Sequence, residues 1–284
     1  MAQAFVIFSA PRCNSTALYR ALNLIPENRV AYEPAIQVID NIQRCTSSTY
    51  DRVRALLSDY SGWKRMFDPT GYPFQSVHEA SIEVMEQHRA FWVELNTVIL
   101  NYLGLSIVFL RRRSGFQRIV SDLVGRATNV WRHSELPISH NYARRYKDVI
   151  SKLTLPAIDE KLVRWYLKNL LLIEDQLRNV TKNRVLDVYY EDLFGPELGV
   201  LQRVERFVEV LKFLRMPIPG GLLDSAKLSL ILGPSAQLND ASIFERIPNY
   251  RELYDKLALS EKTESWAAAG FPGGCGPHDQ GCIQ

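Results

Sequence analysis

Short apolar runs alternate along this chain with longer stretches of helical periodicity. The run at 5–8 is continuous, as expected of a strand that is covered on both faces of a sheet, and further strands are predicted at 63–67, 105–110 and 185–189. Apolar residues with helical spacing predict helices at 49–60, 77–103, 115–128, 158–180, 198–214 and 249–259. Strands that alternate with helices are typical of α/β proteins, so we expect a central parallel sheet flanked by helices.

No internal repeat and no convincing domain boundary interrupts this pattern. We therefore expect a single domain over 1–265, followed at 266–284 by a glycine-rich tail with the composition of a mobile segment. Ligands of parallel sheets bind at the carboxyl ends of the strands. The residues directly after each predicted strand are therefore the candidate site.

The first predicted strand passes into a helix through a short polar turn, in the sequence AFVIFSAPRCNSTALYRAL at 4–22. Asn14, Ser15 and Thr16 are residues that cap helices, and a helix start offers free N–H groups to an anion, most often a phosphate. This makes the predicted domain P-loop-like. In the register of a Walker A loop, however, Ser15 takes the place of the lysine that reaches the terminal phosphates. An ordinary βα turn with polar capping remains the alternative.

A second polar turn follows the third predicted strand, in the sequence RRRSGFQRIVS at 111–121. Ser114 and Gln117 have capping-box spacing and predict a helix start. Arg113 precedes that start, and Ser121 lies two helical turns beyond Ser114 on the same helix face. A guanidinium and a hydroxyl placed in this way can hold one phosphate. For the other two arginines of the run, a solvated strand end remains the alternative.

Composition limits the range of partners. The chain has 34 basic and 31 acidic residues, a net charge of +3, which does not indicate a nucleic acid as partner. It lacks an apolar stretch long enough to span a membrane, and it lacks the features of a signal peptide. Its four cysteines are too scattered for a disulfide framework. We therefore expect a cytoplasmic protein. Cys275, His278 and Cys282 fall short of the four ligands of structural zinc, and no metal site is predicted.

Together the two turns resemble the cofactor motifs of sulfotransferases that use 3′-phosphoadenosine 5′-phosphosulfate (PAPS). The sequence PRCNSTAL at 11–18 is similar to the family's 5′-phosphosulfate loop, P-[RK]-S-G-[ST]-T-x-L, with Asn14 in place of the usual glycine. Asn is among the residues that best tolerate a positive φ. Arg113 and Ser121, eight residues apart, resemble the 3′-phosphate motif, and YEDL at 190–193 resembles a third. The nearest likeness is to bacterial carbohydrate sulfotransferases of the trehalose type, whose E-P dipeptide is matched by Glu33-Pro34.

This resemblance implies in-line transfer of a sulfuryl group from PAPS to a hydroxyl of a small-molecule, carbohydrate or lipid acceptor, leaving 3′-phosphoadenosine 5′-phosphate (PAP). It implies that Arg12 stabilises the leaving group, that Arg113 and Ser121 hold the 3′-phosphate, and that Tyr190 touches the adenine. The 5′-phosphate would be held by the side chains and backbone N–H groups of Cys13, Asn14, Ser15, Thr16 and Ala17.

Glu33 is the expected base for the acceptor hydroxyl, with His78 as the second candidate. Lys64 resembles a family lysine that orients sulfate or acceptor, and Arg246 is a candidate for closing over the cofactor. Two other functions remain open at this stage, a P-loop nucleotide kinase and a non-catalytic nucleotide-binding protein. The sequence specifies neither the acceptor nor the oligomeric state.

Overall fold

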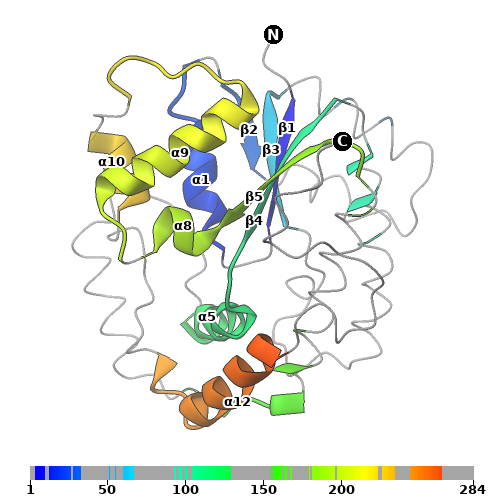
Figure 1. Ribbon diagram of the computed structural model, residues 1–284, viewed down its shortest axis with the longest axis vertical. Helices are drawn as coiled ribbons and strands as arrows, with labels where there is room; N and C mark the ends of the chain where they lie inside the picture. Colours follow the sequence, from blue (N-terminus) through cyan, green and yellow to red (C-terminus); the bar gives the residue numbers. More distant parts are fainter. Residues whose placement is uncertain are drawn as a thin grey trace.

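A parallel five-stranded sheet forms the centre of the computed structural model (Figure 1). The structure describes residues 4–9, 13–26, 28–32, 60–66, 104–128, 181–195, 197–222, 226–233 and 244–263, together with positions 51, 55, 93, 96, 97, 100, 101, 155, 157–161, 163, 164, 167 and 179. The strands are β1 (Phe5–Ser9), β2 (Val30–Tyr32), β3 (Gly62–Met66), β4 (Ser106–Arg111) and β5 (Arg184–Tyr189). Their order is β2-β3-β1-β4-β5, and every neighbouring pair is parallel. The predicted α/β class with a central parallel sheet is confirmed.

The described helices are α1 (Ser15–Leu22), α5 (Gly115–Thr128), α8 (Tyr190–Phe194), α9 (Val200–Leu214), α10 (Ala226–Leu232) and α12 (Tyr250–Thr263). The four predicted strands are confirmed to within one residue at each end, and so are the helices at 115–128 and, with small shifts, at 198–214 and 249–259. The three predicted helices at 49–60, 77–103 and 158–180 fall mostly outside the described residues. Three short elements, β2, α8 and α10, are not predicted by the pattern, because none is long enough to show a period.

The strand β1 is central because it is apolar on both faces. All five of its residues are fully buried, as are the first five of β4 beside it. Phe5 pairs with Gly62 of β3 and with Ser106 of β4. The Phe5 ring lies over Gly62, where even a methyl group would overlap it. Glycine at this position therefore leaves the space that the Phe5 ring occupies.

Helices α1, α8, α9 and α10 lie together on one side of the sheet (Figure 1). They bury mainly leucine, alanine and phenylalanine side chains in one hydrophobic cluster with β1 and β4: Ala17, Leu18, Ala21, Leu22, Phe207, Leu211, Leu214, Leu228 and Leu232. Within the part of the chain that the structure describes, no helix is long and apolar enough to cross a membrane.

A second hydrophobic cluster joins α5 to α12 beyond the end of the sheet, in the lower part of Figure 1. Its members include Phe116 and Val120 of α5 and Leu253 and Leu257 of α12. The Phe116 ring stacks on Tyr250 with the centroids 5.6 Å apart. Helix α12 thus supports α5, the helix that begins at the second predicted turn.

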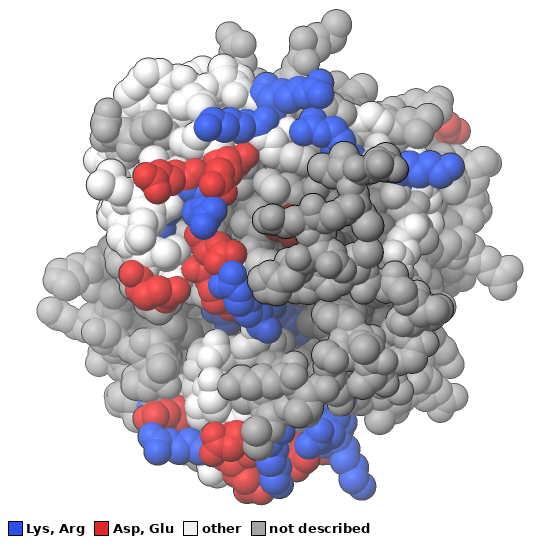
Figure 2. All heavy atoms as spheres, viewed as in Figure 1, with Lys and Arg blue, Asp and Glu red and all other residues white. Residues whose placement is uncertain are grey.

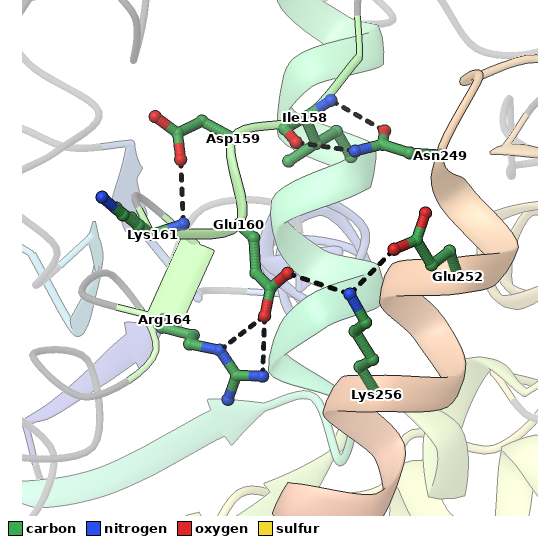
Figure 3. Close-up of polar contacts among 8 residues, drawn as sticks. All are labelled: Ile158, Asp159, Glu160, Lys161, Arg164, Asn249, Glu252 and Lys256. Atoms are coloured by element: carbon green, nitrogen blue, oxygen red, sulfur yellow. Dashed lines mark hydrogen bonds and ion pairs between the residues drawn. The ribbon is translucent and has the colours of Figure 1, made fainter.

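Polar contacts fix α12 to the segment around residue 158 (Figure 3). The Asn249 side chain donates to the Ile158 carbonyl at 2.8 Å and accepts from its N–H at 2.9 Å. Glu160 accepts from Arg164 at 2.9 Å, and Lys256 links it to Glu252. The hydrogen bond from Arg164 is the main cause of the lowered pKa of Glu160.

A fully buried arginine, Arg203, joins the ends of three helices. Its guanidinium donates to the carbonyls of Gly195 after α8, Leu198 before α9 and Leu232 at the end of α10. These are the carbonyls that helix ends and loops leave without intrahelical partners. Burial lowers the pKa of Arg203, and the neighbouring Tyr190 and Glu197 oppose this effect.

We expect Arg203→Met to lower the free energy of unfolding by about 2–4 kcal/mol, because three buried carbonyls lose their donors. Urea denaturation measures the change. The matched control is Arg206→Met on the same helix, whose exposed pair with Glu209 should be worth less than about 1 kcal/mol. Equal effects of the two substitutions would contradict the role given to Arg203.

Candidate anion-binding site at the carboxyl edge of the sheet

The two predicted turns follow neighbouring strands. The chain runs from β1 through α1 to β2 on one side of the sheet, and from β4 to β5 on the other. Ser9, the last residue of β1, is in register with Leu110 of β4. The chain therefore leaves these two adjacent strands in opposite directions, and ligands of open parallel sheets bind at such a switch point.

The turn before α1 contains Asn14 in the left-handed conformation, with φ 61° and ψ 27°. The Ala17 N–H donates to the Asn14 carbonyl at 3.0 Å, and this bond opens the helix. A left-handed residue directly before a helical one directs successive N–H groups towards a common point, an arrangement that binds anions. Asn14 thus has the positive φ that the missing glycine would have supplied without strain.

The donors of this turn fit a phosphate group. The Asn14 side chain does not cap the helix, and its Nδ2 atom is buried without a hydrogen-bond partner within the described part of the chain. The same part shows no hydrogen bond from the N–H groups of Ser15 and Thr16. The first turn of α1 has no acidic residue, and Ser15 is buried. The described turn therefore offers donors and no negative charge.

The second turn has the predicted helix start. Ser114 Oγ accepts the Gln117 N–H at 3.2 Å, and the Ser114 carbonyl accepts the Arg118 N–H at 3.2 Å. These bonds confirm that α5 begins directly after Ser114.

The three arginines before α5 have three different environments. Arg111 is buried, and its Nη2 atom donates to Asp187 Oδ1 at 2.9 Å and to the Tyr189 hydroxyl at 3.1 Å. A solvated strand end is therefore wrong for Arg111, because β5 supplies it with a carboxylate. Arg112 is half-buried and lies over the Tyr190 ring, 4.0 Å from the centroid. That distance is typical of a cation–π contact.

Arg113 is exposed and contacts the start of α8. Its Nη2 atom lies 2.7 Å from Asp192 Oδ1 and 2.8 Å from Oδ2, and its N–H donates to Glu191 Oε2 at 3.0 Å. The guanidinium also lies 4.9 Å from the Tyr189 ring centroid. The structure thus brings the third predicted motif, YEDL, against the second.

Tyr190 lies beneath Arg112 as part of the hydrophobic core. Its ring packs against Phe194 with the centroids 5.9 Å apart. Burial raises the pKa of Tyr190, and Arg112 partly offsets the increase. The predicted contact between Tyr190 and adenine remains a prediction.

Helix α5 carries two buried polar residues, Arg118 and Ser121, which are 1% and 4% exposed. Residues three apart on a helix are neighbours on one face, with Cβ atoms about 5–6 Å apart. Arg118 is therefore a buried cation beside Ser121, the predicted phosphate ligand, and the sequence analysis does not include Arg118 among the site residues. The spacing of three residues between Arg118 and Ser121 is the sequence signal that could have identified Arg118.

Of the remaining candidate residues, some lie within the part of the chain that the structure describes and others lie outside it. Lys64 is buried on β3, in register with Tyr32 of β2 and Ile7 of β1. Tyr32 is the last residue of β2, and Glu33 follows it in the sequence. The residues Arg12, Glu33, His78, Cys275, His278 and Cys282 lie outside the described residues, as does the predicted tail at 266–284.

Charges of both signs are interspersed on the face shown in Figure 2. Basic and acidic side chains lie next to one another there, which agrees with the ion pairs of Arg113, Arg206, Arg251 and Lys256.

In comparisons with known proteins, no protein-family model matches the chain, and no curated protein gives a significant match. The resemblance to sulfotransferases therefore rests on the sequence motifs.

We expect Asn14→Ala to lower the free energy of unfolding by about 1–2 kcal/mol, because alanine resists the left-handed conformation. Asn14→Gly should cost less, since glycine adopts that conformation without a steric penalty. Thermal and urea unfolding of both variants measure the difference. An alanine variant as stable as the glycine variant would show that the positive φ is not required by the turn.

Proposed function

We propose that the protein is a PAPS-dependent sulfotransferase with a P-loop-like domain. The observation that carries this proposal is the pair of turns at the switch point: donors around Asn14 after β1, and arginines around Arg113 after β4. Two anion-binding turns on adjacent strands suit a nucleotide that carries phosphates at both its 5′ and 3′ positions. The strand order, with β1 between β3 and β4, supports the P-loop-like assignment.

In this proposal the first turn holds the 5′-phosphate end. The N–H groups of residues 13–16 and the hydroxyls of Ser15 and Thr16 would donate to its oxygens, since buried donors aimed at an anion are worth more than donors in water. The Ala17 N–H, included in the sequence prediction, already donates to the Asn14 carbonyl. Arg12 would stabilise the charge that develops on the leaving phosphate when the S–O bond breaks. PAPS supplies the activated sulfuryl group, and the protein supplies position and charge.

The second turn holds the 3′-phosphate. Arg113 would contact it at the start of α5, and Ser121, with Arg118 beside it, would contribute from the helix face. These residues would distinguish PAPS from nucleotides that lack a 3′-phosphate. Glu33, which follows β2, would accept the proton of the acceptor hydroxyl, with His78 as the second candidate.

Arg113→Met should weaken PAP binding about 10- to 100-fold and change 5′-AMP binding less than twofold, because one charge-assisted contact to the 3′-phosphate is lost. Isothermal titration calorimetry with both nucleotides measures this. Arg251→Met, which removes another exposed and paired arginine, is the control. An equal loss for both nucleotides would remove Arg113 from the 3′-phosphate.

Titration with ATP and magnesium separates the proposal from its kinase alternative. A nucleotide kinase would bind ATP with magnesium and turn it over, whereas a sulfotransferase should prefer PAP. A non-catalytic nucleotide-binding protein would bind PAP but transfer nothing from labelled PAPS to a panel of sugars, lipids and phenols.

Glu33→Gln should lower sulfuryl transfer by about 100-fold or more, which is the usual contribution of a positioned base. PAP affinity should stay within twofold, because Glu33 acts on the acceptor. The assay uses labelled PAPS with whichever acceptor the wild-type protein accepts. A fully active variant would exclude Glu33 as the base, and His78→Ala would then be tested in the same assay.

A further inference from the structure

The proposed 3′-phosphate ligand, Arg113, already binds a carboxylate of its own chain. Both oxygens of Asp192 lie within 2.8 Å of Arg113 Nη2. A second carboxylate, Glu191, accepts the Arg113 N–H at 3.0 Å. Any phosphate that approaches this guanidinium therefore meets two negative charges from the first turn of α8.

The pair between Arg113 and Asp192 can open at little cost. The two side chains are 54% and 37% exposed, and exposed ion pairs contribute little to stability. The backbone bond to Glu191 does not involve the guanidinium, so the turn can stay attached to α8 while the side chain changes partner. The hydrogen bond to Glu209 is the main cause of the raised pKa of Arg206 on α9, and Asp192 lies close enough to Arg206 to add to it. A released Asp192 would thus still face a cation.

We propose that Asp192 competes with the 3′-phosphate for Arg113 and so determines how tightly the nucleotide is held. This inference rests on the proposed function. A carboxylate in contact with the same guanidinium must be displaced, or tolerated at short range, by an incoming dianion, and like charges at such distances repel. The consequence is weaker binding of PAPS and PAP, and faster release of PAP after transfer.

The test is Asp192→Asn, which keeps the size of the side chain and removes its charge. We expect PAP to bind about tenfold more tightly than to the wild-type protein, from the Coulomb energy of nearby charges in a solvent-exposed site. Binding of 5′-AMP should change less than twofold. Asp192→Glu keeps the charge and is the matched control. Thermal unfolding should change little, because the pair is exposed.

A double variant shows whether the effect passes through Arg113. In an Arg113→Met background, Asp192→Asn should improve PAP binding less than twofold. A gain in PAP affinity that persists in this background would overturn the proposal, since it would show that Asp192 repels the phosphate without acting through Arg113. Unchanged or weaker PAP binding by Asp192→Asn would also overturn it, and would make Asp192 a residue that positions Arg113. Failure of the wild-type protein to bind PAP would instead refute the proposed function, and the inference with it.

Discussion

The pairing of β1 with β4 is the constraint on which the rest of the structure depends. Both strands are buried on both faces, so their backbone polar groups must be satisfied within the sheet. The parallel register from Phe5 with Ser106 to Ser9 with Leu110 satisfies these groups and places the two strand ends side by side. The candidate site depends on this placement, because the turn at Asn14 and the turn at Arg113 follow the ends of two paired strands.

The three consecutive arginines have different environments because the strand β4 ends within the run. Arg111 is the last residue of β4, so its side chain lies against β5 and binds Asp187. Arg112 and Arg113 have left the strand, and they meet Tyr190 and Asp192 at the start of α8. Only Arg113 is both exposed and held by an exposed partner. It is consequently the one of the three whose guanidinium can exchange a carboxylate for a ligand without uncovering a buried charge.

The sequence predicts the strands and the long helices because continuous apolar runs and helical spacing are local signals. It predicts the start of α5 for the same reason, since Ser114 and Gln117 are three residues apart. It does not predict that β5 lies beside β4, because strand order depends on contacts between distant segments. The partners of Arg111 and Arg113 come from β5 and α8, 76 and 79 residues away, so neither ion pair has a local signal. The resemblance to YEDL indicates that this segment matters, but not that its aspartate faces the arginine.

The two ends of the proposed nucleotide site differ in what binding requires. At the first turn the described donors are backbone N–H groups and the buried Nδ2 of Asn14, held by a left-handed residue and a helix start. Such donors are preorganised, so little reorganisation opposes an anion there. At the second turn the principal donor is the exposed side chain of Arg113, which is already paired with Asp192. A nucleotide would therefore be anchored through its 5′-phosphate and discriminated through its 3′-phosphate, which combines selectivity for a doubly phosphorylated ligand with an affinity low enough for product to leave.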